Sequence, residues 1–486
     1  MANLTRRAFG HIVSALGLAA IGARAAGRPA ARMWASSVDR QQRMSEQPRV
    51  EFSPRKQSDR SAQSAVYSIS INPERSYQTM LGFGSSLEPA TCWNLSRLEP
   101  SQRARVVGRI VSPTNGIGMN LMRICMGTPD FTGDPWYSYD DLPPGEKDPE
   151  LKRFSIDKDR AYILPALRLA REMNKELLLF ASPWSPPGWM KTTGSLIGGS
   201  LLPQWYATYA DYFVKFLKGY ADAGVQVYAV TVQNEPGVDR AKEKDSRWHY
   251  PSCHWTGDQE RDFIRDHLGP ALRRHGLKTR IWCYDHNYNV SPKDDDPGID
   301  YPRTILSDAE AARFVDGVAF HGYAGLPDGM STFHRQFPKT PIHFTEGSIF
   351  GIRGGRQLID RLRNHASSYN AWVTMLDDNR KPNNGPFRAG RTILSLNPVS
   401  LEVSEHFDFD LYGHFMKFIA RGAVRIESSE PSSELANVVF RNPDGNLVLI
   451  VANGANAERE VEILNGSFTA HLSLRPESIA TIVWKG

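Results

Sequence analysis

Cysteine is scarce in this sequence: only four of the 486 residues are cysteines, and they lie far apart, at Cys92, Cys125, Cys253 and Cys283. So few cysteines exclude a fold held together by disulfides, and their spacing leaves any pairing unassigned. His249, Cys253 and His254 lie close together, but no second Cys/His pair completes a zinc-binding set. The sequence also lacks a glycine-rich phosphate-binding loop. We therefore expect neither a metal ion nor a cofactor.

A strong charge of one sign and a long apolar run are also missing. The formal net charge is only +5, and no dense Lys/Arg tract is interleaved with aromatic residues, so the sequence pI of about 8.9 does not indicate a nucleic-acid partner. The apolar stretch from Ile12 to Ile21 is shorter than the roughly 20 residues of a membrane-spanning helix. We expect no stable membrane span in the mature protein. No sequence signal sets an oligomeric state.

The N-terminal segment 1–26 resembles a bacterial twin-arginine export signal. Arg6 and Arg7 precede the apolar stretch, and a small-residue cleavage pattern ends at Ala25. We expect cleavage near Ala25, export by the twin-arginine route and a periplasmic or secreted location. An uncleaved anchor is the alternative.

The composition supports a large folded core, since 41% of the residues are hydrophobic and 10% are aromatic. Between residues 80 and 398, short apolar runs alternate with amphipathic helical stretches, the pattern of βα units around a parallel sheet. Eight strand candidates lie near residues 80–84, 118–124, 177–182, 225–233, 279–285, 316–321, 341–346 and 369–376. Eight such units predict an α/β fold, a (β/α)8 TIM barrel, whose active site forms at the C-terminal ends of the strands.

The regions that flank the barrel differ from it in pattern. In residues 27–48 apolar residues do not recur at a regular spacing, which indicates a flexible linker. Residues 49–79 and 399–486 contain short alternating strands, and the turn Asn442-Pro443-Asp444-Gly445 indicates a hairpin. We expect these two end segments to form one attached β-sandwich domain.

Two glutamates stand where predicted strands end. Glu235 follows the apolar run 225–233 and precedes Pro236, which cannot continue a strand, and Glu346 ends a second apolar run before Gly347. Two such carboxyl groups can cleave a glycosidic bond, because one donates a proton to the leaving oxygen while the other stays ionised and attacks. A single glutamate at a strand end more often has a capping role or forms a salt bridge. A catalytic role for the pair therefore needs further support.

That support comes from a series of motifs between about residues 78 and 428. They are Gly82-Phe83-Gly84, Asn120-Leu121-Met122-Arg123, Asp130-Phe131, residues 181–192, Gln233-Asn234-Glu235-Pro236, residues 261–264, His321-Gly322-Tyr323, Thr345-Glu346 and residues 413–419. In their order and spacing these motifs resemble glycoside hydrolase family 30 and in particular its glucosylceramidase (acid β-glucosidase) branch. The resemblance implies a retaining β-glycosidase with Glu235 as acid/base and Glu346 as nucleophile. Glu235 must then hold a proton while Glu346 is ionised, so we expect their environments to move their pKa values apart.

The same resemblance implies seven substrate-binding residues: Arg123, Asp130, Trp184, Asn234, His321, Tyr323 and Trp372. Asn234 is similar to the family residue that hydrogen-bonds the sugar 2-hydroxyl, and Arg123 would orient the nucleophile. Asp130 and Trp184 match positions that line the sugar subsite. The other three lie at or near the ends of the sixth and eighth predicted strands, around the same pocket.

Three positions depart from the family pattern. Glu88 places a carboxylate one position before an aspartate found in many relatives, Gly322 replaces a bulky aromatic residue, and Met375 replaces a second tryptophan. The leading hypothesis is a glucosylceramidase-like enzyme that removes a terminal β-linked glucose from a carbohydrate or glycolipid. The departures keep open an exported β-1,6-glucanase, a β-xylosidase or a β-fucosidase. A non-catalytic carbohydrate-binding protein is the alternative from another class.

Overall fold

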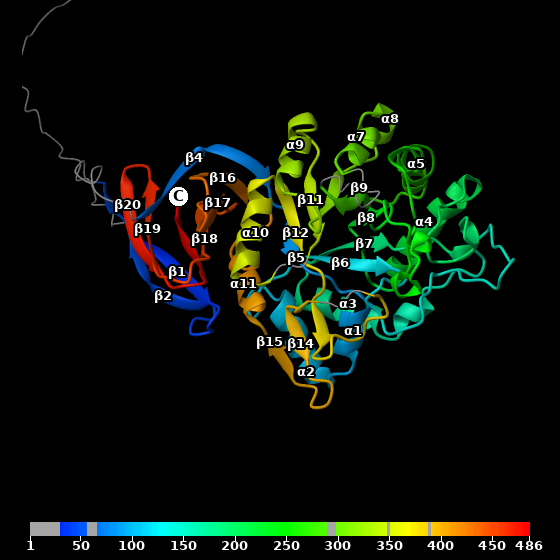
Figure 1. The fold of residues 1–486 in the computed structure, drawn as a ribbon, viewed down its shortest axis with the longest axis horizontal. Coiled ribbons are helices and arrows are strands. Elements are labelled where there is room, and N and C mark those ends of the chain that lie inside the picture. The colour runs from blue at the N-terminus through cyan, green and yellow to red at the C-terminus, as the bar shows by residue number, and fades with distance from the viewer. Residues whose placement is uncertain (1–29, 56–65, 289–297, 348–349, 387–389) are drawn as a thin grey trace, which may run out of the picture.

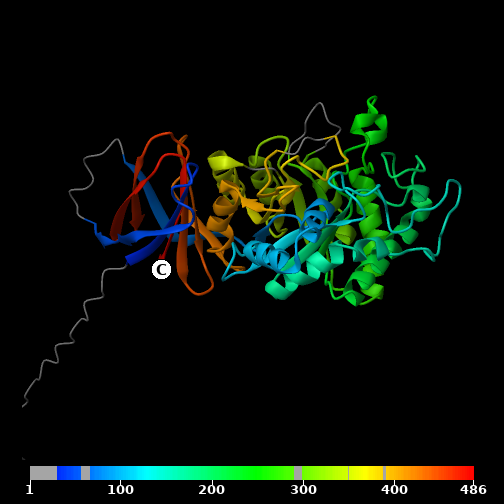
Figure 2. The same cartoon turned by 90° about the horizontal axis from the view of Figure 1, so that it is seen from below.

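The computed structural model describes residues 30–55, 66–288, 298–347, 350–386 and 390–486. The predicted export signal lies outside these ranges. The chain forms a β-sandwich beside a larger barrel, as both views show (Figure 1, Figure 2). None of the helices in the described ranges combines the length and apolarity that a membrane crossing needs.

The barrel is an eight-stranded parallel sheet in the order β5-β12-β11-β10-β9-β8-β7-β6. Its strands are β5 (Gly82–Gly84), β6 (Leu121–Met126), β7 (Leu178–Pro183), β8 (Ala229–Thr231), β9 (Arg280–Asn287), β10 (Gly317–His321), β11 (Ile342–Glu346) and β12 (Ala366–Asn370). The sheet closes because the Asn120 N–H donates to the Phe83 carbonyl at 2.9 Å and Ser86 pairs with Arg123 in parallel. The predicted TIM barrel is confirmed.

The eighth strand lies earlier in the sequence than predicted. The prediction of 369–376 followed apolar residues, whereas β12 begins at Ala366 and contains Ser367 and Ser368, both buried in the barrel wall. A pattern based on apolar residues misses such a strand. The chain leaves the sheet after Asn370 and forms a small second sheet from β13 (Met375–Asp377), β14 (Leu394–Leu396) and β15 (Val403–Glu405).

Helices surround the barrel and bury their apolar faces against it. They are α1 (Pro89–Ser96), α2 (Pro100–Val111), α3 (Ile163–Met173), α4 (Tyr206–Asp222), α5 (Gly257–Phe263), α6 (Gly269–Arg274), α7 (Asp300–Leu306), α8 (Ala309–Ala312), α9 (Asp328–Gln336), α10 (Gly351–Arg363) and α11 (Phe407–Met416). A π-helical turn, Ile264–Leu268, joins α5 to α6. On α4, the side chains of Tyr209, Tyr212, Phe213 and Phe216 recur at helical spacing and are fully buried.

Both ends of the chain build the β-sandwich. Its strands are β1 (Ala30–Ser37), β2 (Ser45–Glu51), β3 (Ser53–Pro54), β4 (Tyr67–Thr79), β16 (Val424–Ser428), β17 (Leu435–Arg441), β18 (Asn446–Asn453), β19 (Arg459–Asn465), β20 (Phe468–Leu474) and β21 (Ser478–Lys485). N-terminal β1 pairs with C-terminal β21, and β4 lies between β16 and β19, so the blue and red strands of Figure 1 share one sheet. The predicted sandwich from both ends of the chain is confirmed.

The flexible linker predicted at 27–48 is wrong for its described residues. β1 and most of β2 fall in this range, and Ala31, Met33 and Ala35 of β1 alternate into the sandwich core. The inward side chains of β1 are mostly small, so its apolar alternation is weak in the sequence. The four cysteines are buried free thiols.

Candidate active site

Charged side chains meet at the C-terminal ends of the barrel strands. Arg123 lies in β6, Glu235 follows β8, Asp285 lies in β9, His321 ends β10 and Glu346 ends β11. Because the strands are parallel, their C-terminal ends open on one side of the barrel. The barrel therefore brings together the two predicted catalytic glutamates, which are 111 residues apart in the sequence.

The backbone is strained where two of these carboxylates emerge. Glu235 has a φ of 49° and Asp285 a φ of 73°, both in the left-handed region that non-glycine residues seldom adopt. The Glu235 N–H donates to the Asp285 carbonyl at 3.0 Å, which holds the two strand ends together. Strain of this kind persists where the surroundings over-determine it, and it is typical of functional sites.

Arg123 is the fully buried centre of the cluster. Its guanidinium donates to the Glu346 carboxylate, to Asp285 Oδ2 at 2.8 Å and to Asn234 Oδ1 at 2.7 Å. It also lies 4.8 Å from the centre of the Trp184 ring. Although burial raises the pKa of Asp285, the charge of Arg123 and the neighbouring His321 hold it well below its usual range. Arg123 thus fixes the nucleophile candidate and keeps its neighbours anionic.

His321 touches all three carboxylates rather than an open pocket. It is fully buried; its Nδ1 lies 3.3 Å from Glu235 Oε1, and its Nε2 lies 3.0 Å from Asp285 Oδ1 and 3.8 Å from Glu346 Oε2. Burial lowers its pKa, but the Glu346 and Asp285 charges outweigh that effect and raise the pKa of His321 to about 10. The imidazole is therefore protonated at neutral pH.

The pKa values of the two glutamates are moved apart in the order opposite to expectation. Burial raises the pKa of Glu346, and the charges of His321 and Arg123 oppose that shift. Burial also acts to raise the pKa of Glu235, but the hydrogen bond with His321 and the nearby His286 lower it to about 2. The acidic proton is thus on His321, one hydrogen bond away from Glu235.

The two glutamates are close enough to act on one bond. Glu235, His321 and Glu346 each place one side-chain oxygen or nitrogen within 4.8 Å of the others. Three such groups are also able to hold a metal ion, but Arg123 already supplies a positive charge beside Glu346, with which a divalent cation would compete.

Tyr323 approaches Glu346 from the solvent side. Its hydroxyl donates to Glu346 Oε1 at 2.9 Å, and 48% of the residue is exposed. Glu346 therefore receives hydrogen bonds at both oxygens, one from Arg123 and one from Tyr323. Both contacts stabilise its anionic form.

Aromatic side chains form one wall beside the carboxylates. The rings of Trp184 and Trp372 are stacked with centres 5.2 Å apart, and Phe131 packs edge-on against Trp372. Asp130 is buried nearby; burial and the charges of Glu346 and Glu235 raise its pKa well above the usual value. A neutral carboxyl group there can both donate to and accept from sugar hydroxyls.

The structure thus gathers all the predicted site residues at one end of the barrel, and it adds Asp285. This residue binds Arg123 and His321 and accepts from the hydroxyls of Ser182, Thr231 and Thr345 at 2.6–2.9 Å. Asp285 ends the strand candidate 279–285, so the rule that singled out Glu235 and Glu346 applies to it as well.

Two of the departures from the family pattern have a structural reason. Glu88 is fully buried and caps α1 by accepting from the Thr91 N–H at 2.9 Å and the Ser86 hydroxyl at 2.6 Å. A Cβ atom on Gly322 would lie 2.5 Å from Arg361 Nη2 and 2.8 Å from Phe344 Cζ. The space that a larger residue at this position needs is therefore occupied.

The chain is similar in sequence to known glycosidases. The chain is 30% identical over 448 residues to the lysosomal acid glucosylceramidase of Mus musculus, covering 86% of this chain and 83% of that one. It is 29% identical over 437 residues to an endo-1,6-β-D-glucanase of Neurospora crassa, covering 86% and 85%.

Solved structures of other proteins have a similar fold. SrfJ from Salmonella typhimurium superposes with a TM-score of 0.84 at 26% identity, and the endo-β1,6-glucanase BT3312 with a TM-score of 0.80 at 25% identity. Each match covers 94% of this chain and 100% of the other. Residues 80–377 match the glycosyl hydrolase family 30 TIM-barrel domain and residues 422–482 the β-sandwich domain of the same family. The chain belongs to glycosyl hydrolase family 30.

Proposed function

We propose that this glycoside hydrolase cleaves β-linked glucosides with retention of configuration, using Glu346 as nucleophile and Glu235 as acid/base. The observation that carries the proposal is the approach of the two carboxylates, whose side-chain oxygens lie within 4.8 Å of each other. Retaining enzymes hold their two carboxyl groups about 5 Å apart, whereas inverting enzymes leave room for a water molecule and need a wider gap.

Glu346 attacks the anomeric carbon in the first step. A bond forms between its carboxylate oxygen and that carbon, the bond to the leaving oxygen breaks, and Glu235 gives its proton to the leaving oxygen. In the second step Glu235 takes a proton from water, the water oxygen bonds to the anomeric carbon, and the ester to Glu346 breaks. The hydrogen bonds from Arg123 and Tyr323 support Glu346 as an anion and as a leaving group.

His321 holds the proton that Glu235 needs. In this structure His321 is protonated and Glu235 is ionised. The hydrogen bond between His321 Nδ1 and Glu235 Oε1 provides the direct path for that proton. A sugar in the site displaces water from Glu235, which disfavours its charged form and draws the proton onto it.

The remaining predicted residues bind the sugar. Arg123 donates a hydrogen bond to the amide oxygen of Asn234, so the amide N–H group of Asn234 is left for the substrate. We propose that this N–H group donates to the sugar 2-hydroxyl, a hydrogen bond that strengthens in the transition state. Asp130 forms hydrogen bonds with sugar hydroxyls that lie farther from the reacting bond than the 2-hydroxyl. The stacked rings of Trp184 and Trp372 form an apolar wall beside the sugar ring.

The substrate we propose is a terminal β-linked glucose, as in a glucosylceramide. A β-1,6-glucan is the second candidate, because the endo-1,6-β-glucanases match this chain as closely as the glucosylceramidases do. Hydrolysis of a panel of β-glucoside, β-xyloside and β-fucoside aryl glycosides, of glucosylceramide in detergent and of linear β-1,6-glucan tests both. Glucose released from glucosylceramide supports the first candidate, whereas oligosaccharides released from the glucan support the second. No turnover on any substrate would favour a carbohydrate-binding protein.

We also propose export by the twin-arginine route from the signal at residues 1–26. The paired Arg6 and Arg7 before an apolar stretch support it. Replacing both with lysine should leave the protein uncleaved inside the cell, as cell fractionation would show. Unchanged export of the Arg6→Lys/Arg7→Lys variant would contradict this route.

A further inference from the structure

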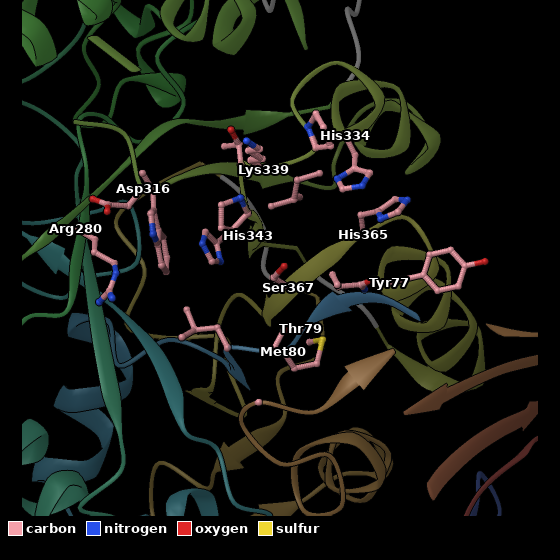
Figure 3. Close-up of a pocket in the computed structure, with 18 of the residues that line it drawn as sticks. Tyr77, Thr79, Met80, Arg280, Asp316, His334, Lys339, His343, His365 and Ser367 are labelled. Carbon is pink, nitrogen blue, oxygen red and sulfur yellow. The ribbon is translucent and has the colours of Figure 1, made fainter. Parts of the chain in front are cut away.

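A second cavity lies at the end of the barrel opposite the carboxylate cluster, with a volume of about 720 Å³ (Figure 3). The N-terminal ends of barrel strands line it: Arg280 begins β9, Asp316 directly precedes β10, and His343 is the second residue of β11. The end of β4 and residues 421–422 complete the lining from the side of the sandwich. Small-molecule sites have volumes of about 300–1,000 Å³, so the cavity has the size of a binding pocket.

Positive charge predominates around this cavity. Arg280, Lys339 and Arg421 line it, and Asp316 is the one carboxylate among the lining residues. The Arg280 guanidinium lies 4.3 Å from the centre of the Tyr228 ring, and neither Arg280 nor Lys339 forms an ion pair with a carboxylate in the part of the chain that the structure describes. Asp316 accepts from the Ile281 N–H at 3.0 Å. The cavity therefore offers two cations, Arg280 and Lys339, that form no ion pair with any carboxylate of the described residues.

The floor of the cavity contains a buried donor without an acceptor. Trp282 is 1% exposed, lines the cavity and stacks on His343 with ring centres 3.9 Å apart, and its indole N–H has no hydrogen-bond partner among the described residues. Buried polar groups are nearly always paired in proteins, so each exception needs an explanation. Burial, together with the charge of Arg280, lowers the pKa of His343 to about 3, so this imidazole is neutral at neutral pH.

A pair of stacked histidines forms the far wall. The rings of His334 and His365 lie 3.8 Å apart, and Nδ1 of His365 is buried without a partner among the described residues. His365 follows the end of α10 with a φ of 70°, a left-handed position where glycine is usual. His365 is thus held in an uncommon backbone conformation at the edge of the cavity. Figure 3 shows both rings together at one side of the cavity, with Arg280 and Asp316 at the other.

We infer that this cavity binds a small anionic ligand carrying a phosphate or carboxylate group. Arg280 and Lys339 provide the positive charge for the anionic group, and the Trp282 N–H and the neutral imidazoles provide hydrogen bonds for its remaining oxygens. The two unpaired cations, the orphaned indole donor and the strained histidine have no role in the chemistry at the other end of the barrel. A bound anion that pairs with these groups would explain all of them together.

Isothermal titration calorimetry of the mature protein at low salt tests this inference. The probes are inorganic phosphate, glucose 6-phosphate and glucuronate, with glucose as the neutral control. Binding of an anion that weakens about tenfold or more in the Arg280→Gln/Lys339→Gln variant, and that also weakens on addition of salt, is the expected result. Inorganic phosphate binding as tightly as glucose 6-phosphate would identify a free phosphate site, and preference for glucose 6-phosphate or glucuronate would identify a site for an acidic sugar.

A matched control separates local contacts from net charge. Lys175 and Lys278 are exposed and do not line the cavity, so Lys175→Gln/Lys278→Gln removes the same charge elsewhere and should bind the anion normally. Melting temperatures establish that both variants are folded. The single Lys339→Gln variant removes only one of the two charges and disturbs the cavity less. The inference is overturned if none of the anions binds, if the cavity variant binds as the natural protein does, or if binding disappears in Glu346→Gln, which would place the anion in the catalytic site.

Discussion

His321 Nδ1 lies 3.3 Å from Glu235 Oε1, so the proposed catalytic acid shares a hydrogen bond with a buried and protonated histidine. The same imidazole reaches Asp285 at 3.0 Å. Glu235 therefore does not hold its proton by burial alone, as a glutamate in an apolar pocket does. The proton belongs to the Glu235–His321 pair, and the pair sets the pH range in which the acid is available.

Replacing His321 with glutamine should narrow the pH profile of kcat/KM from both sides. The charge of His321 lowers the pKa of Glu346, so its loss moves the acidic limb of the profile to higher pH. In the natural protein the proton of the Glu235–His321 pair leaves His321, whose pKa is raised to about 10. In the variant Glu235 alone must hold this proton, so the alkaline limb of the profile moves to lower pH. His414→Gln is the control, because His414 is equally buried and has two hydrogen bonds but lies in α11. An unchanged profile for His321→Gln would contradict this role.

Tyr323→Phe should lower kcat by about tenfold, because a hydrogen bond to a charged group contributes about 1.5 kcal/mol or more. The variant loses the donor at 2.9 Å from Glu346 Oε1 but keeps the ring. Its acidic limb should move to higher pH, since the Glu346 anion loses a stabilising contact. Tyr67→Phe removes a tyrosine hydroxyl in β4 of the sandwich, bonded to the Glu430 carbonyl, and is the control. Equal kcat for both variants and the natural protein would show that Tyr323 does not act on Glu346.

Glu235→Gln should slow hydrolysis according to the leaving group. A glucoside with a poorly acidic alcohol needs the proton, and we expect a loss of about 100-fold to 10,000-fold in kcat/KM. A dinitrophenyl glucoside releases a stable anion without protonation and should lose much less. The ratio of the two losses is an internal control for misfolding, because a misfolded enzyme would lose both activities equally.

Glu88→Gln should raise the melting temperature at pH 8 and leave it nearly unchanged near pH 4. Burial raises the pKa of Glu88 from 4.5 to about 7, although hydrogen bonds from Ser86 and Thr91 oppose the shift. Between these values the folded protein binds more protons than the unfolded chain, so stability falls as pH rises, by at most about 3 kcal/mol. Glutamine avoids this ionisation and keeps a cap for α1. The exposed Glu460→Gln is the control, and equal melting curves for both variants at pH 8 would contradict the prediction.

Local patterns in the sequence were sufficient to predict the strand ends that carry Glu235 and Glu346, because an apolar run followed by Pro236 or Gly347 is a local signal. They were sufficient for the sandwich hairpin at residues 442–445 for the same reason. The contacts of His321 were not predictable: its position at the end of β10 predicted a sugar-facing group, whereas packing from three other strands buries it between carboxylates. Such contacts depend on the closure of the barrel.

One strand, β1, was missed and another, β12, was predicted too late in the sequence, because each buries small or polar residues. β1 buries Ala31 and Ala35, and β12 buries Ser367 and Ser368, none of which resembles a typical apolar strand residue. The reversed pKa order of Glu235 and Glu346 was also missed, since it arises from the burial of Glu346 and from the contacts of Glu235 with His321 and His286, which are distant from Glu235 in the sequence.

Trapping the glycosyl enzyme tests the central claim most directly. An activated β-glucoside with fluorine in place of the 2-hydroxyl forms the covalent intermediate quickly but hydrolyses slowly, because fluorine destabilises both transition states. After proteolysis, mass spectrometry of the inactivated protein should find one fluoroglucosyl group, attached to Glu346. Attachment to another residue, or turnover without a covalent adduct and with an inverted anomeric product in the NMR spectrum, would contradict the account.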